Sequence, residues 1–314
     1  MKIPYIAGDY VNVYAPEPDV FQGPDSCHFG AGQRYERWVP NDFTVLWDGA
    51  YWHLIGITHP CPDWFADSES RPPEGGADVH EAEWQLFHAI SQGRTLRDSL
   101  IPGGFVQVEQ VLPASQRPGE RPDIWAPIIW RLRDEFAMLY SPNPMRLAVS
   151  KDLKRWSLRG EVLDVGEPSA RDPNIMEEEG RLSVVYLKGD SICLRETTDL
   201  MHYGSERTLY TGRPGIAMES PILKRIHGWY YLLYCIYDAS DIINGFYDYR
   251  TFVHAAPSLE GLMSAPCVAQ LRAHAPELLQ DERGDWYIAS VEWPKRGVSI
   301  APIGWRDAPE FRRE

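Results

Sequence analysis

Three acidic residues stand where a repeated chain pattern would bring them together. Asp42, Asp172 and Glu219 lie at the beginning of apolar segments, each within two residues of a proline or of Phe43. A single acid beside a proline commonly caps a turn, but three at corresponding places predict a cluster. Crowded carboxylates repel one another, so at least one has its pKa raised and stays protonated near neutral pH. A protonated carboxyl beside an ionised carboxylate is the pair that hydrolysis of a glycosidic bond requires.

The elements that would position these acids come from an internal repeat. Four segments share one order: a proline, a short apolar run, a polar turn, and a run that alternates apolar and aromatic residues. Alternation with a period of two on both sides of a turn predicts paired strands. A proline is tolerated at the first residue of a strand. The prolines are Pro127, Pro173, Pro221 and Pro276, and a fifth copy without the proline begins at Asp42.

A turn suited to a hairpin follows each opening strand. Four of the five turns contain a glycine, which supplies a positive φ without steric cost. The predicted turns are Asp48-Gly49, Arg133-Asp134, Glu179-Gly180, His227-Gly228 and Arg283-Gly284.

Five units of roughly 45 to 55 residues, with about four strands each, predict an all-β fold, a single five-bladed β-propeller over residues 1–314. A β-sandwich would explain the strands but not the repeated place of the proline. The starts of the inner strands of a propeller face one central funnel, where we expect the three acids. Residues 1–38 are predicted to be irregular and to wrap a blade or close the ring. Two insertions are predicted, at 60–78 and 238–249.

The composition excludes several classes of partner. The chain of 314 residues has a formal net charge of −14, whereas nucleic-acid binders and proteins on anionic membranes need basic surfaces. The five cysteines are scattered, which argues against a zinc cluster or a disulfide framework. No basic and apolar leader is visible and no run reaches about 18 apolar residues. We therefore expect a cytoplasmic protein, or a secreted one if a leader had been trimmed, with the oligomeric state left open.

Five short motifs carry a resemblance to a known group of enzymes. They are Asn41-Asp42-Phe43, Trp125-Ala126-Pro127, Arg171-Asp172-Pro173, Met218-Glu219-Ser220-Pro221 and His274-Ala275-Pro276-Glu277. With them the chain resembles the five-bladed propeller glycosidases of glycoside hydrolase families 43 and 32, the arabinanase, xylosidase, levanase and invertase group. The resemblance covers about residues 38–305. It implies an oligo- or polysaccharide substrate and no required cofactor.

The resemblance implies a role for each acid. Asp42 would be the general base, or the nucleophile in the retaining branch, Asp172 the pKa modulator or transition-state stabiliser, and Glu219 the general acid. The first motif keeps only the Asn-Asp of the retaining fructosidases. The acid of those enzymes precedes a Cys, whereas Glu219 precedes Ser220-Pro221, which is closer to the Glu-Gly-Pro of family 43. An Arg-Asp-Pro triplet is typical of the fructosidases, so the inverting mechanism is favoured only modestly.

Five further residues are candidate substrate ligands. Trp125 is the best candidate for a platform on which a sugar stacks, and Asn41 adjoins Asp42. Arg171 would bond sugar hydroxyls or hold Asp172 ionised, although a plain salt bridge explains it as well. His274 would point at the axis, where related arabinanases hold a central water or calcium, or would be a core histidine. Glu277 is a weaker candidate. Most of the other tryptophans should pack between blades, namely Trp47, Trp52, Trp130, Trp156, Trp229 and Trp286.

Three functions remain open on the sequence. The first is an inverting, exo-acting glycosidase on an arabinofuranoside or xyloside, and the second a retaining β-fructosidase on the same scaffold. The third is a propeller that binds glycan without cleaving it. A phosphorylase is disfavoured because no cluster of Arg, Lys and His near the three acids offers a phosphate site.

Overall fold

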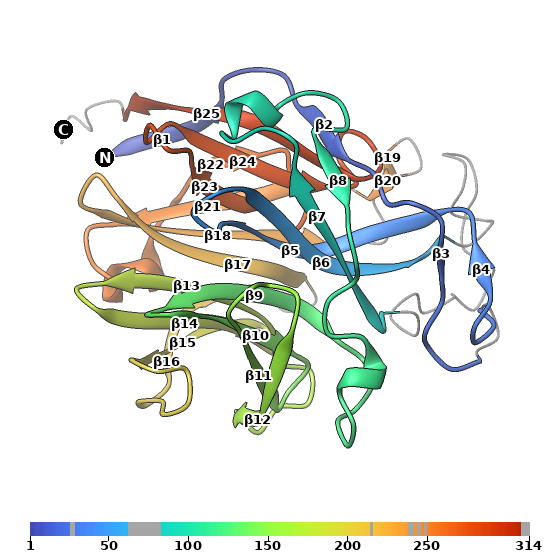
Figure 1. Ribbon diagram of the computed structural model, residues 1–314. Coiled ribbons are helices and arrows are strands. Elements are labelled where there is room, and N and C mark those ends of the chain that lie inside the picture. Colours follow the sequence, from blue (N-terminus) through green and yellow to red (C-terminus); the bar gives the residue numbers. More distant parts are fainter. Residues whose placement is uncertain are drawn as a thin grey trace, which may run out of the picture.

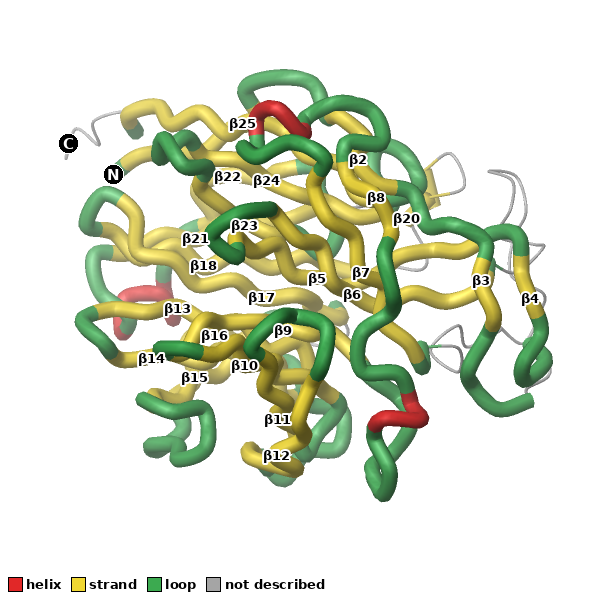
Figure 2. Tube along the Cα trace, viewed as in Figure 1, coloured by secondary structure: helices red, strands yellow, loops and turns green. Residues whose placement is uncertain are grey.

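The fold is a ring of five antiparallel sheets around a central axis, as predicted (Figure 1). Strands make up nearly all of its regular structure (Figure 2). No helix in the described part of the chain is long and apolar enough to cross a membrane. The structure is a computed structural model that describes residues 1–25, 29–61, 83–213, 216–237, 242–243, 246–247 and 250–308.

Four blades follow one another along the chain, each with its innermost strand first. Blade I contains β5(Trp38–Trp47), β6(Trp52–Pro60), β7(Gln85–Ser91) and β8(Phe105–Gln107). Blade II contains β9(Trp125–Leu132), β10(Glu135–Ser141), β11(Met145–Ser150) and β12(Trp156–Leu163). Blade III contains β13(Arg171–Glu178), β14(Arg181–Lys188), β15(Ser191–Thr197) and β16(Arg207–Thr211). Blade IV contains β17(Ala217–Ile226), β18(Trp229–Tyr237), β21(Arg250–Ala256) and β22(Cys267–Leu271).

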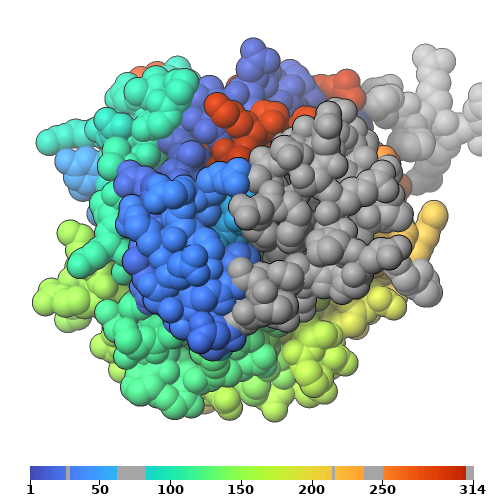
Figure 3. All heavy atoms as spheres, turned by 90° about the vertical axis from the view of Figure 1, so that its right-hand side faces the viewer, coloured from blue at the N-terminus to red at the C-terminus, as the bar shows by residue number. Residues whose placement is uncertain are grey.

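The fifth blade joins the two ends of the chain. Its strands are β23(Glu277–Gln280), β24(Trp286–Val291), β25(Val298–Asp307) and β1(Lys2–Ile6), and β2(Val11–Tyr14) also pairs with β25. The space-filling view shows dark blue N-terminal residues directly beside red residues from near the other end (Figure 3). The pairing closes the ring, because the last sheet takes its outer strand from the start of the chain.

The prediction that residues 1–38 are irregular was therefore wrong at β1 and β2, and also at the short pair β3(Asp19–Val20) and β4(Arg34–Tyr35). β1 contains Pro4, which removes one backbone donor, and it lies at the edge of its sheet, where that donor is not needed. Its partner strand is about 300 residues away in the sequence, so no local pattern marks the pairing.

The predicted turns are confirmed. Positive φ angles occur at Gly49, Arg133, Glu179, Gly180, His227, Gly228 and Gly284. The tryptophans expected between blades are confirmed as well, because Trp52 lies in a buried core cluster and Trp47, Trp130, Trp156, Trp229 and Trp286 pack against such clusters.

The two predicted insertions fall largely outside the described residues. Of 60–78, the structure describes only Pro60, which ends β6, and Cys61. Of 238–249, it describes a short antiparallel pair, β19(Ile242–Ile243) and β20(Phe246–Tyr247). Short 3-10 helices lie in connections of the described part of the chain: η3(Arg97–Ser99), η4(Ala114–Gln116) and η5(Glu260–Ser264).

Candidate functional site

A cavity of about 360 Å³ lies at the starts of the inner strands of blades I to IV. The three predicted acids, Asp42, Asp172 and Glu219, all line it. Three of the five predicted substrate ligands line it too, namely Asn41, Trp125 and Arg171. Residues from four successive blades, far apart in the sequence, thus meet in one concave site.

A bulge in each inner strand turns these residues toward the cavity. On β13, two residues, Asp172 and Pro173, lie opposite one residue of β14. The same irregularity occurs on β5, β9 and β17. The residue before the proline has a positive φ in four blades: 40° at Ala126, 57° at Asp172, 49° at Ser220 and 39° at Ala275. A bulge of this kind bends the strand and re-aims its side chains.

The three acids do not share one register position, contrary to the prediction. Measured from the bulge, Asp172 corresponds to Asn41 and Ser220, and Asp42 is one residue further along its strand. Glu219 is one residue earlier and corresponds to Arg171. The carboxylates still converge, because the bulge spreads neighbouring positions around the same cavity.

Ser220 connects two of the acids, and sequence reasoning gave it no role. Its hydroxyl donates a hydrogen bond of 2.6 Å to Oδ1 of Asp42. Its backbone N–H donates one of 3.0 Å to Oδ2 of Asp172. The residue was visible in the Glu-Ser-Pro motif, but nothing in one sequence shows that this serine from blade IV reaches an acid of blade I.

Glu83 is a fourth carboxylate in the cavity, and it was also missed. Its side chain is 2% exposed and accepts a hydrogen bond of 3.0 Å from Nδ2 of Asn41. The residue lies outside the repeated motifs, just after the predicted insertion at 60–78, so it had no counterpart to draw attention to it.

Burial and neighbouring acids together raise the pKa of Asp42 well above its ordinary value. Desolvation is the largest cause, followed by the charge of Asp172, and Glu219 and Glu83 act in the same direction. The hydrogen bond from Ser220 opposes them and lowers the pKa. This is the crowding expected of carboxylates that share a desolvated site.

Arg171 brings positive charge to the acids. Its Nε lies 3.5 Å from Oδ2 of Asp172, and its NH2 lies 3.4 Å from Oε1 of Glu219. The same nitrogen donates a hydrogen bond to the carbonyl of Met218. The charge of Asp172 is the main cause that raises the pKa of Arg171, so the guanidinium stays protonated. Arg171 forms its salt bridges inside the cavity, and its contact with sugar hydroxyls stays a prediction.

His274 lies beside the cavity as a neutral side chain. Its Nε2 is 4.0 Å from Oε2 of Glu219, and burial lowers its pKa to about 4. The described residues contain no group of three or more His, Cys, Asp or Glu side chains that could hold a metal ion. The side chains around His274 therefore do not form a metal cage, and a calcium ion or a water near His274 stays a prediction.

Glu277 does not line this cavity, and its contact with substrate stays a prediction. It lines a smaller space that Asp42 and Asp172 also line. Lys224 is its charged neighbour. Burial raises the pKa of Glu277 to about 7, and Lys224 opposes this. The residue comes three positions after His274 on the inner strand, which carries it past the cavity.

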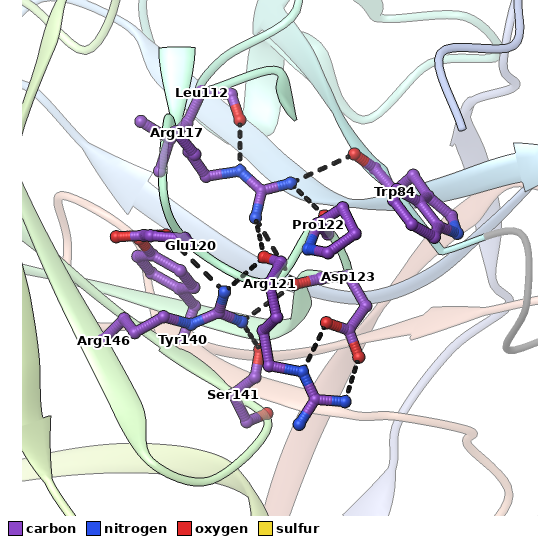
Figure 4. Close-up of polar contacts among 10 residues, drawn as sticks. All are labelled: Trp84, Leu112, Arg117, Glu120, Arg121, Pro122, Asp123, Tyr140, Ser141 and Arg146. Carbon is purple, nitrogen blue, oxygen red and sulfur yellow. Dashed lines mark hydrogen bonds and ion pairs between the residues drawn. The ribbon is translucent and has the colours of Figure 1, made fainter. Parts of the chain in front are cut away.

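A second group of buried charged residues contacts the chain segment that precedes Trp125. Arg117 and Arg146, each 2% exposed, point their guanidinium groups at the backbone carbonyls that precede Trp125 (Figure 4). Arg146 donates to the carbonyls of Arg121 and Asp123, both at 2.8 Å. We call this group the arginine cluster; it comprises Arg117, Arg146, Glu120, Tyr140 and the carbonyls that Arg117 and Arg146 contact.

The arginine cluster also reaches the cavity wall at two other points. Arg117 donates to the carbonyl of Trp84, next to Glu83. Arg146 donates to the carbonyl of Ser141, whose hydroxyl donates to the carbonyl of Trp125 at 3.1 Å. The hydroxyl of Ser141 also accepts the backbone N–H of Asp172 at 3.4 Å. The cluster thus fixes the backbone that carries the cavity wall of blades I and II.

Solved structures share this fold. An endo-arabinase from Bacteroides thetaiotaomicron superposes with a TM-score of 0.64 at 13% identity, covering 86% of this chain and 96% of that one. A thermostable family-43 glycoside hydrolase gives 0.61 at 15% identity, with 87% and 91% covered. An exo-1,5-alpha-L-arabinanase from a bovine ruminal metagenomic library gives 0.60 at 18% identity, with 87% and 94% covered.

No protein-family pattern and no curated protein sequence matches the chain. At these levels of identity the structural likeness establishes the five-bladed propeller fold, as the sequence predicted. The name of one of these neighbours gives family 43, which agrees with one of the two families that the sequence resembles. The resemblance to family 32 stays a prediction.

Proposed function

We propose that this protein is a glycoside hydrolase that cleaves a furanoside or pentoside linkage in arabinan- or xylan-type chains. The observation that carries the proposal is that the carboxylates of Asp42, Asp172 and Glu219 line one cavity. The names of proteins with the same fold, two arabinanases and a family-43 glycoside hydrolase, support this reaction class.

In the proposed reaction Glu219 gives its proton to the glycosidic oxygen as the bond from that oxygen to the anomeric carbon breaks. Asp42 accepts a proton from a water molecule, whose oxygen bonds to the anomeric carbon from the opposite side. The product sugar then has the inverted configuration. Asp172, held by Arg171 and by the backbone of Ser220, keeps a negative charge near the positive charge that develops on the sugar ring.

Trp125 is proposed as the platform for the sugar ring. It lines the cavity at the start of β9, and the arginine cluster fixes the chain that precedes it. An indole face suits the C–H face of a sugar. Cleavage from the chain end is part of the proposal and rests on the two insertions in blades I and IV.

The test is a panel of p-nitrophenyl furanosides and pyranosides, with arabinan, xylan and levan oligosaccharides beside them. We expect hydrolysis of an arabinofuranoside or a xyloside, and an inverted product by proton NMR at the anomeric position. Asp42→Asn and Glu219→Gln should each lower turnover by roughly 10³-fold while circular dichroism stays unchanged. Binding of a glycan with no hydrolysis by the wild type would replace this proposal with the glycan-binding propeller.

The contact of Arg171 with Asp172 favours a second candidate, a retaining β-fructosidase. The Arg-Asp pair is the part of the motif set that is typical of that group. Release of fructose from levan or sucrose with retention at the anomeric carbon would support it over the inverting arabinosidase or xylosidase.

A further inference from the structure

Ser220 touches two acids through two different groups. The hydroxyl contacts Asp42 of blade I, and the backbone N–H contacts Asp172 of blade III, although Ser220 itself belongs to blade IV. A change of side chain therefore removes the first contact and keeps the second. Of the described residues, Ser220 is the one that donates a hydrogen bond to the Asp42 carboxylate.

The fold does not require a hydroxyl at this position. Ala126 and Ala275 occupy the same place before the bulge proline in blades II and V, with φ angles of 40° and 39°. Ser220 has nearly the same backbone conformation, with a φ of 49°. Because alanine serves the bulge twice in this chain, the hydroxyl of Ser220 has to be explained by what it contacts.

The contact has the length of a charge-assisted bond. At 2.6 Å, the distance from Oγ of Ser220 to Oδ1 of Asp42 lies in the range for a hydroxyl that donates to an ionised carboxylate. Desolvation and three neighbouring acids all favour the protonated form of Asp42, and the bond from Ser220 opposes them. The bond also occupies Oδ1, which leaves Oδ2 as the oxygen that can take a proton from water.

We propose that Ser220 is a positioning residue whose hydroxyl stabilises the ionised form of Asp42 and aims the second oxygen of Asp42 at the attacking water. The inference rests on the proposed function insofar as Asp42 is the general base. The effect of the Ser220 hydroxyl on the charge of Asp42 is a property of the folded protein and can be measured without a substrate.

The experiment compares the wild type with Ser220→Ala and Ser220→Gly. Both variants lose the hydroxyl and keep the N–H to Asp172, and glycine also relieves the positive φ, so a fold that rejects one variant should accept the other. Ser91→Ala is the matched control, because Ser91 is a buried serine whose hydroxyl makes two hydrogen bonds in blade I and lies outside the cavity.

The first readout is the titration of Asp42 by carbon-13 NMR of labelled aspartate, with the resonance assigned by its loss in Asp42→Asn. A hydrogen bond to a charged group is worth enough to move a carboxyl pKa by about one unit. We expect the titration of Asp42 to move upward by about one pH unit in both variants and to stay in place in Ser91→Ala. Identical titrations in the wild type and either Ser220 variant would overturn the proposal.

The second readout is the pH profile of kcat/KM on the best glycoside. The acidic limb should move to higher pH by the same amount in both variants, with up to about tenfold lower activity below the limb. An unchanged limb, with only KM altered, would also overturn the proposal. If the wild type hydrolyses no glycoside, the proposed function fails, and the NMR titration still decides the role of Ser220.

Discussion

The acidic cavity and the arginine cluster both bury ionisable side chains. They differ in how the free-energy cost of desolvating those charges is offset. In the arginine cluster, two guanidinium groups face the carbonyls of residues 112, 121–123 and 141 together with Glu120 (Figure 4). In the cavity, four carboxylates face one another with Arg171 as their cation. Buried guanidinium groups that donate to backbone carbonyls fix the backbone, whereas like charges that are crowded together are poised to change protonation.

The difference follows from the partners. A guanidinium offers five donors in a rigid plane, so several backbone carbonyls can satisfy it at once. Burial lowers the pKa of Arg117 and Arg146, but an arginine remains protonated in proteins. A carboxylate that is desolvated next to other carboxylates finds too few donors, and its pKa rises, as at Asp42.

The largest expected effect concerns the cavity. Asp42→Asn should lower kcat by roughly 10³-fold, because it removes the proposed base. The thermal midpoint should stay unchanged or rise, since the variant removes one of several repelling carboxylates. Steady-state kinetics and thermal unfolding monitored by circular dichroism test both parts. A large drop in the midpoint would show that Asp42 serves stability instead.

The arginine cluster should give the opposite result. Arg146→Met should lower the free energy of unfolding by about 4 kcal/mol, because it removes the buried cation that donates to three carbonyls and pairs with Glu120. Below the unfolding transition, kcat should stay within a factor of a few. Urea titration measures the first quantity, and kinetics at low temperature the second. Arg146→Lys keeps the charge but not the fork, and should lose about half as much.

Glu277 offers a test of pH dependence along the axis. Its pKa in the folded protein is about 7, and that of an exposed glutamate is lower. A raised pKa in the folded state means that stability is lost as the pH rises toward the folded value, by up to about 3 kcal/mol. Thermal unfolding between pH 5 and pH 8 should show this fall in the wild type and a flatter curve in Glu277→Gln. Equal slopes would contradict the assignment.

Trp125 lies between the two regions and should show the smallest effect. Trp125→Leu keeps an apolar side chain but removes the proposed sugar platform, so kcat/KM should fall about tenfold, mostly through KM. The free energy of unfolding should change little, because the arginine cluster holds the preceding chain. A change in kcat alone would speak against stacking of the substrate on this ring.

Much of the fold could be predicted because the signals are local and repeated. The bulge prolines and the glycine turns recur in register, and a repeat of about 50 residues with alternating strands leaves few architectures. The start of the chain escaped this reasoning, because β1 and β2 are strands only through their pairing with β25.

The site was predicted as far as the motifs reach. Asp42, Asp172, Glu219, Asn41, Trp125 and Arg171 all line the cavity, and each stands in a repeated motif. Glu83 lies outside the repeated motifs, and Ser220 is not an acid, so the comparison of acids between repeats found neither. Glu277 stands in a motif but does not line the cavity. The two-against-one bulge decided the case of Ser220, because it shifts which position of a strand faces the cavity.

The sequence by itself determined the five blades, the turns and the set of acids that the inner strands could present. These follow from periodicity, from the φ preferences of proline and glycine, and from repetition. The tertiary structure alone decided which blade's residue touches which acid: Ser220 on Asp42, Glu83 beside Asn41, and two buried arginines behind Trp125. Such contacts join blades far apart in the chain, and their energies depend on distances and burial that no local pattern encodes.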